Sequence, residues 1–327
     1  MNEANIEQVR EGLFRVEIPL PRNPLKAINS YFIKDRERNL IIDTAMNREE
    51  CKLAMFNALD KLHMDLKKTD IFITHLHTDH IGLVDLLMEK GAKAYFNRPD
   101  TEILNIKNIW QLVCSMSGKH GFPVNEIEKA LDEHPGQRYV PRNTANFTMI
   151  DEGDTFKYGD FELYCVSTPG HSRGHTCLYE PRLKWLFSGD HILGDITPNI
   201  STWRIDDNPL GYYFENLDKV YNMPVDLVLP GHRSLFTDHR KRIKELKRHH
   251  RQRLEEVLAI IDNNKPCSAY DVASHISWDL LFDSWDDFPL MQKWFASGEA
   301  LAHILYLEAE GKVKREMNGE IMVFITG

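Results

Sequence analysis

The stretch Ile71-Phe72-Ile73-Thr74-His75-Leu76-His77-Thr78-Asp79-His80-Ile81-Gly82 decides how the rest of the chain is interpreted. Its apolar start predicts a buried strand, and the pattern Leu83-Val84-Asp85-Leu86-Leu87 that follows predicts a helix. Three histidines and one aspartate lie between the two elements. Imidazole nitrogens and carboxylates are the ligands that suit zinc, iron or manganese. The alternative, a polar loop whose histidines cap the next helix, is disfavoured because four potential ligands this close are rarely accidental.

Three later loops add further donors to this set. They are Thr168-Pro169-Gly170-His171, Ser188-Gly189-Asp190-His191 and Leu229-Pro230-Gly231-His232. Each follows a short apolar pattern that predicts a strand, so each places a histidine or aspartate just beyond a strand end. Such loops converge only if their strands share one edge of a sandwich. His175, near the first of these loops, is expected to pack beneath it, and for His191 a substrate contact and a structural role both stay open.

The motif HxHxDH followed by His, Asp and His in this order resembles the metallo-β-lactamase superfamily, over residues 10–235. The resemblance implies an α+β fold, a four-layer αββα sandwich. It also implies two divalent metal ions, with zinc as the first expectation and iron or manganese left open. The implied ligands are His75, His77 and His171 for the first metal, Asp79, His80 and His232 for the second, and Asp190 as the bridge. Asp43 is then expected near the metals, supporting the histidine loop without binding a metal itself.

The resemblance implies a hydrolase in which a metal-bound hydroxide attacks the substrate, with Asp79 and Asp190 as catalytic residues. A single zinc lowers the pKa of bound water from ~15.7 to about 7, so a hydroxide is available near neutral pH. The favoured substrate is the carbonyl of a small thioester, ester or lactone. A phosphodiester hydrolase of the endoribonuclease type is the alternative, and a non-catalytic or redox member of the superfamily also remains open.

With 327 residues, the chain is longer than one typical domain. We predict a catalytic domain over residues 1–238, with a helical insertion at 100–147 interpreted as a lid, and a C-terminal domain over 239–327. The C-terminal part combines predicted helices, capped at Ser268 and Ser297, with a hairpin signal at Asn318-Gly319. This order is similar to a winged-helix domain that follows the catalytic core in a branch including β-lactamase-like protein 2. We interpret it as a packing or dimer element, which leaves a homodimer open.

Aromatic and histidine residues outside the motifs give weaker indications. Trp203, Tyr212 and Tyr213 are candidates to line the substrate pocket, although ordinary core packing is the favoured interpretation. His120 and His134 lie in the helical insertion and are expected to face solvent.

Charge and cysteine content bound the partners and the compartment. The net charge of −9 opposes binding to nucleic acid or anionic membrane, although residues 240–253 contain eight Lys or Arg against one acid. A small-molecule substrate is therefore expected, and a nucleic acid is not. Five widely spaced cysteines without a CxxC pair, a polar start and the absence of an apolar run of about eighteen residues predict a cytoplasmic protein that does not enter the membrane.

Overall fold

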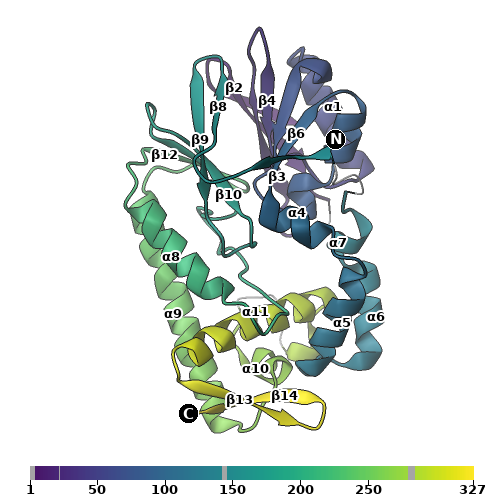
Figure 1. Ribbon diagram of the computed structural model, residues 1–327, viewed down its shortest axis with the longest axis vertical. Helices are drawn as coiled ribbons and strands as arrows, with labels where there is room; N and C mark the ends of the chain where they lie inside the picture. The colour runs from purple at the N-terminus through teal and green to yellow at the C-terminus, as the bar shows by residue number, and fades with distance from the viewer. Residues whose placement is uncertain (1–3, 22, 142–145, 279–283) are drawn as a thin grey trace. The chain divides into compact units, whose positions relative to one another are not determined.

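The computed structural model describes residues 4–21, 23–141, 146–278 and 284–327 (Figure 1). These residues form two compact units. The first unit comprises Met1–Ile106, Tyr139–Pro198 and Lys219–Arg242, and the second comprises Lys107–Arg138, Asn199–Asp218 and Ile243–Gly327. Within the part of the chain that the structure describes, no helix is long and apolar enough to cross a membrane.

A seven-stranded sheet forms one half of the first unit. Its strands, in spatial order, are β1 (Asn5–Arg10), β2 (Leu13–Pro19), β3 (Ala27–Ile33), β4 (Asn39–Ile42), β5 (Thr69–Phe72), β6 (Lys93–Asn97) and β7 (Thr148–Ile150). The strands from β1 to β4 pair antiparallel, whereas those from β4 to β7 pair parallel. Because parallel strands end at the same edge of a sheet, the loops after β4, β5 and β6 begin close together.

A five-stranded sheet forms the other half. Its spatial order is β12 (Leu227–Pro230), β11 (Trp185–Gly189), β10 (Thr176–Glu180), β9 (Phe161–Ser167) and β8 (Thr155–Tyr158). β11 and β12 pair parallel, and β10 pairs antiparallel with both β9 and β11. β9, β11 and β12 therefore run in one direction, and the loops that follow them leave from one edge.

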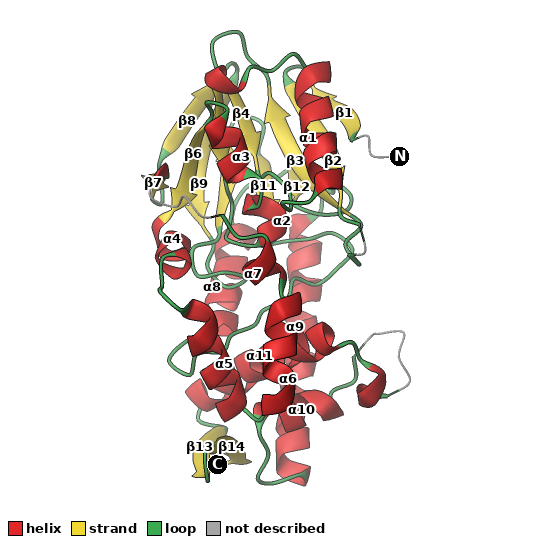
Figure 2. Ribbon diagram, turned by 90° about the vertical axis from the view of Figure 1, so that its right-hand side faces the viewer, coloured by secondary structure: helices red, strands yellow, loops and turns green. Residues whose placement is uncertain are grey.

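The two sheets pack face to face, and helices cover the outer face of the larger one. Alternate residues of the strands separate into two cores: Ile42 and Phe72 contact the smaller sheet through residues such as Leu178, whereas Ile41 and Ile71 face the helices. Those helices are α1 (Glu49–Lys61) and α3 (Val84–Glu89) (Figure 2). The unit also contains the helices η1 (Leu66–Lys68), α2 (Thr78–Ile81) and α4 (Arg98–Leu104). The predicted α+β class and αββα sandwich are thus confirmed.

The second unit is mostly helical. It contains α5 (Ile109–Lys119), α6 (Val124–Glu133), α7 (Pro135–Arg138), α10 (Ala269–His275), η3 (Trp285–Asp287), α11 (Leu290–Ala309) and the hairpin β13 (Val313–Asn318) and β14 (Ile321–Thr326). It also includes most of α8 (Pro209–Tyr221) and α9 (His239–Asn263), each of which has one end in the first unit. One of its hydrophobic clusters is centred on Phe122, Ile127 and Trp294.

Of the local predictions tested next, one is confirmed and two are wrong. Ser268 caps α10 as predicted, in a reciprocal capping box with Asp271. Ser297 caps no helix: α11 begins at Leu290, and the Ser297 hydroxyl donates to the Lys293 carbonyl one turn back, 2.7 Å away. His120 does not face solvent but is only 1% exposed. Strands β1 and β8, which were not predicted, lie at sheet edges: β1 is mostly polar, and β8 is only four residues long.

The chain segment predicted as an insertion, 100–147, contains most of α4 and then the helices α5, α6 and α7, which are joined by short non-helical stretches. Residues 142–145 lie outside the described part. Lys107–Arg138 belongs to the same compact unit as Ile243–Gly327, and not to the unit that contains the two large sheets. The division at residue 238, the role of the insertion as a lid and the winged-helix interpretation remain predictions.

Candidate metal centre

Seven predicted donors lie at the loop ends of the two sheets. The turn after β5 carries His75, His77, Asp79 and His80. The other three donors each follow a different strand of the smaller sheet: His171 after β9, Asp190 after β11 and His232 after β12. Since these three strands run in the same direction, the sandwich brings donors that are up to 157 positions apart in the sequence, from His75 to His232, to one edge.

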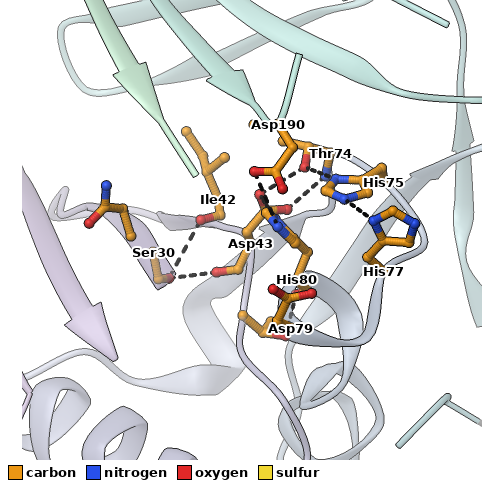
Figure 3. Close-up of polar contacts among 12 residues, drawn as sticks. Ser30, Ile42, Asp43, Thr74, His75, His77, Asp79, His80 and Asp190 are labelled. Carbon is orange, nitrogen blue, oxygen red and sulfur yellow. Dashed lines mark hydrogen bonds and ion pairs between the residues drawn. The ribbon is translucent and has the colours of Figure 1, made fainter. Parts of the chain in front are cut away.

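The donor atoms form three overlapping groups whose members lie within 4.8 Å of one another. The groups are His75, His77 and His171; His75, His80 and Asp190; and Asp79, His80 and His232. Figure 3 shows five of these residues, with Asp190 above His80 and His75 beside His77. In the first group, the His75 Nε2 atom lies 3.0 Å from the His77 Nδ1 atom.

Asp190 lies at the meeting point of the groups. Its Oδ1 atom is 3.5 Å from His80 Nε2, and its Oδ2 atom is 3.5 Å from His232 Nε2 and 3.7 Å from His171 Nε2. The same His232 nitrogen is 3.4 Å from Asp79 Oδ2. These separations exceed the ordinary length of a nitrogen-to-oxygen hydrogen bond. His80, His171 and His232 therefore surround a common space with Asp190 rather than bonding tightly to it.

Hydrogen bonds on the far side of each ring fix which nitrogen faces that space. His80 Nδ1 is 2.7 Å from Asp43 Oδ2, so this nitrogen carries the proton and donates it to the carboxylate (Figure 3). His232 Nδ1 likewise donates to the Ala27 carbonyl at 2.7 Å. In both residues Nε2 is therefore the ring nitrogen that is turned towards the other donors.

Thr74 is a site residue that the sequence interpretation missed. Its hydroxyl donates to Asp43 Oδ2 at 2.8 Å and lies 3.0 Å from His75 Nδ1, from which it accepts a hydrogen bond. Its backbone N–H donates to Asp43 Oδ1, also at 2.8 Å. A threonine beside a histidine motif carries no distinctive signal in a sequence, because threonine is common at strand ends.

Asp43 reaches this position through an unusual backbone conformation. Its φ of 59° lies in the left-handed region, which aspartate tolerates better than most residues. The Ser30 hydroxyl donates to its carbonyl at 2.5 Å, and its own N–H donates to the Phe72 carbonyl at 2.8 Å. The chain is thereby turned so that the carboxylate points beneath the histidine loop.

The backbone also approaches the site closely at Gly231. A Cβ atom there would lie 2.5 Å from Asp190 Oδ1 and 2.8 Å from His80 Cε1, which neither group could accommodate. Glycine is therefore required immediately before His232 for that loop to reach the other donors.

Burial and neighbouring charges shift the acidities within the site. Burial, together with the neighbouring His171, lowers the pKa of His77 to about 3, so its ring is neutral near pH 7. Burial also lowers the pKa of His232, but the carboxylates of Asp190 and Asp79 outweigh this effect and raise the value to about 10. Burial raises the pKa of Asp79, yet His232 and His80 bring it below its usual range. Asp79 is thus ionised and paired with a protonated His232, and a bound cation would take the place of that proton.

Other histidines near the site support its loops. His175 is buried, accepts a hydrogen bond at Nε2 from the Asp190 N–H (3.1 Å), and donates from Nδ1 to Thr168 Oγ1 (2.8 Å). It therefore packs beneath the loops, as expected. His191 is also fully buried.

The three aromatic candidates for the pocket, Trp203, Tyr212 and Tyr213, lie in the second unit. Tyr213 is fully buried, and its ring contacts that of His250. The Trp203 ring packs on Trp294, with 4.6 Å between ring centroids, whereas Tyr212 is 44% exposed. Core packing accounts for Tyr213 and Trp203, and a pocket role for any of the three stays a prediction.

Known protein families resemble this chain over most of its length. The sequence profile of the metallo-beta-lactamase superfamily matches residues 24–232. A second profile, described as the metallo-beta-lactamase-like C-terminal domain, matches residues 254–326. The first profile covers the stretch in which all seven donors lie.

Individual relatives are similar over most of the chain. The beta-lactamase-like protein 2 homolog of Caenorhabditis elegans is 24% identical over 279 residues, which cover 84% of this chain and 79% of that protein. A Bos taurus protein named acyl-coenzyme A thioesterase MBLAC2 is 25% identical over 236 residues, covering 69% of this chain and 80% of that protein. The crystal structure of a beta-lactamase domain protein from Burkholderia ambifaria superposes with a TM-score of 0.85 at 27% identity, covering 99% and 94% of the two chains.

Proposed function

Because this chain belongs to the metallo-β-lactamase superfamily, we propose that it is a hydrolase that uses two divalent metal ions to cleave a small thioester, ester or lactone. The observation that carries the proposal is the convergence of seven donors around Asp190, with donor atoms of the groups within 4.8 Å of one another. Metal-dependent hydrolysis is the chemistry that the superfamily and this donor set share.

The donor geometry fits divalent cations. Two atoms that each lie about 2.0–2.1 Å from a tetrahedral zinc ion are about 3.3 Å apart. The distances from His232 Nε2 to Asp79 (3.4 Å) and to Asp190 (3.5 Å) are close to that value. His80 Nε2, His232 Nε2 and Asp190 Oδ1 are also buried polar atoms without a hydrogen-bond partner, which a bound cation would satisfy.

In the proposed arrangement, His75, His77 and His171 hold the first ion, and Asp79, His80 and His232 hold the second. Asp190 lies 3.5 Å from His80 and 3.7 Å from His171, one residue of each group, which supports its proposed role as the shared carboxylate that would offset the repulsion between the ions. When bound, such ions activate a water molecule and polarise the carbonyl that it attacks. Zinc is the proposed metal, although nitrogen and carboxylate donors also suit iron and manganese.

The protein residues have the task of holding this geometry. Asp43 orients His80 directly, and it orients His75 through the Thr74 hydroxyl. The Ala27 carbonyl orients His232. Each of these contacts fixes a proton on the ring nitrogen away from the site, so that Nε2 is the nitrogen left to face a metal ion.

A thioester is the favoured substrate because one relative is named as a thioesterase. The Bos taurus protein, named as an acyl-coenzyme A thioesterase, covers 69% of this chain. A thioester carbonyl is also a good electrophile, and its thiolate leaves without prior protonation. We propose in addition that residues 239–327 form a separate packing or dimer domain resembling a winged helix.

A substrate panel tests the proposal. Metal-loaded protein should be offered acyl-thioesters, esters, lactones and short RNAs, with chelator-treated protein and a His77→Ala variant as controls. We expect the loaded protein to hydrolyse acyl-thioesters and both controls to lose this activity. Preferential cleavage of RNA, or thioester hydrolysis that survives complete removal of metal, would overturn the proposal.

A further inference from the structure

Asp100 is a buried carboxylate that connects two loops of the metal centre. It lies in the first turn of α4, directly after β6, and is 0% exposed. Its Oδ2 atom accepts hydrogen bonds from the Leu76 N–H (3.0 Å) and the Ser172 hydroxyl (2.8 Å). Its Oδ1 atom accepts one from the Gly174 N–H at 2.7 Å.

The three residues that donate to Asp100 belong to two loops that carry proposed metal ligands. Leu76 lies between His75 and His77, while Ser172 follows His171 directly. The first loop leaves the seven-stranded sheet, and the second leaves the five-stranded sheet. Among the described residues no strand pairing joins the two sheets, so the hydrogen bonds within each sheet cannot set the distance between these loops. The Thr176 N–H donates to the Thr74 carbonyl (2.9 Å) where the two loops begin and end, and the Asp100 carboxylate bonds to both loops beside the histidines.

Asp100 is itself held firmly. The side chain of Asn97 accepts a hydrogen bond from the Asp100 N–H at 2.8 Å and caps α4. The loop after β9 packs tightly on this helix start, because a Cβ atom on Gly174 would lie 1.6 Å from Asn97 Oδ1. Only glycine permits this approach. The carboxylate therefore has little freedom to follow either loop.

We propose that Asp100 is a positioning residue that fixes the spacing of the His75–His77 loop and the His171 loop, and so builds the three-histidine group. The inference rests on the proposed function in that this group holds a metal ion. A carboxylate suits the task better than an amide, because all three of its partners donate. An asparagine would turn its NH2 group towards at least one of the two backbone N–H donors.

The test is the affinity of each metal ion in Asp100→Asn, measured by competition with a coloured chelator. We expect the wild type to bind two zinc ions, and the variant to bind one of them roughly 10–100-fold more weakly, as for other residues that orient ligands. In a His232→Ala background, where the three-histidine group is intact, the same weakening should persist for the remaining ion.

Asp70→Asn is the matched control. Asp70 is 3% exposed in the same unit and accepts hydrogen bonds from Arg38 and from the Tyr158 hydroxyl (2.8 Å), but it touches neither loop. Its variant should lower the Tm and leave both metal affinities unchanged. A purely structural role for Asp100 would give the same pattern.

Ser172→Ala removes only one of the three hydrogen bonds that Asp100 accepts. This variant tests the positioning role if Asp100→Asn does not fold. It should lower the affinity for the same metal ion, by a smaller factor. A folded Asp100→Asn or Ser172→Ala protein that keeps both wild-type affinities would overturn the inference alone. A wild-type protein that binds no metal would instead overturn the proposed function, and the inference with it.

Discussion

The Asp43 Oδ2 atom lies 2.7 Å from the His80 Nδ1 atom, and this contact joins a residue after β4 to a residue after β5. The same carboxylate accepts hydrogen bonds from the backbone and the hydroxyl of Thr74, both at 2.8 Å. Asp43 thus sets the tautomer of His80 directly and that of His75 through Thr74. A change at Asp43 should therefore act on metal binding without removing any proposed ligand.

Asp43→Asn is the sharpest variant of this contact, because asparagine also tolerates the left-handed backbone at position 43. If the asparagine NH2 group faces His80, the ring must accept at Nδ1 and carry its proton on Nε2, the proposed ligand atom. We expect metal affinity to fall roughly 10–100-fold with little change in fold. Zinc titration together with circular dichroism measures both, and unchanged affinity would contradict the orienting role.

Metal content gives a second prediction. Seven donors in three groups should hold two ions per chain. Elemental analysis of protein prepared without chelator should therefore give close to two equivalents. Because bound metal stabilises only the folded state, chelation should also lower the Tm, and added zinc should restore it. A stoichiometry of one that excess metal cannot raise would rule out the dinuclear centre.

Replacement of Asp190 by alanine gives the third prediction. Asp190 lies 3.5–3.7 Å from three histidines of the site, so its loss leaves both proposed ions without their shared negative charge. Hydrolysis should fall on the order of thousands-fold, as for residues that act as a unit. The far-ultraviolet spectrum should not change. Near-normal turnover in a folded, metal-loaded Asp190→Ala protein would exclude the bridging role.

The basic residues of α9 distinguish a small substrate from RNA. Arg242 donates to the Leu193 (2.7 Å) and Ile196 (2.9 Å) carbonyls, and Lys247 pairs with Asp218, so these two serve the fold. The informative variant replaces the exposed residues Lys241, Lys244 and Arg248 with Gln. Thioester turnover should hardly change. An RNA substrate would instead lose affinity, with the salt dependence flattened by ~0.7 per phosphate contact on a single strand.

Glu299 in α11 gives a prediction on pH. Burial raises its pKa to about 7, although Arg253 and a hydrogen bond from Asn199 act in the opposite direction. Between about pH 4.5 and 7, the folded chain keeps a proton that the unfolded chain releases. This stabilisation is complete below about pH 4.5 and is lost as the pH rises to about 7.

The Glu299→Gln variant isolates that contribution, because glutamine is neutral at every pH and keeps an acceptor for Asn199. From pH 5 to pH 8 the wild-type Tm should fall further than the Tm of the variant, under identical metal conditions. Parallel Tm curves for the two proteins would show that Glu299 is ionised in the folded state throughout.

Local patterns in the sequence were sufficient for most of the elements. The apolar runs before the four donor loops predicted the strands β5, β9, β11 and β12, and Ser268 marked the start of α10. The local patterns gave the wrong helix start at Ser297. The apolar residues before this serine belong to α11, and its buried hydroxyl donates to a carbonyl within the same helix. The local patterns also failed at His120, because burial is a property of packing and histidine occurs on both surfaces and interiors.

The sequence by itself determined the ligand types of the candidate site, because HxHxDH and the three later loops each end a strand pattern with a metal-binding side chain. Only the tertiary structure decided how those loops are held together. Thr74 and Asp100 carry no motif, and their roles depend on partners in other loops: Asp43 for the first, and Leu76, Ser172 and Gly174 for the second. A hydrogen bond between distant segments depends on the packing of two sheets, and no local pattern of residues encodes that packing.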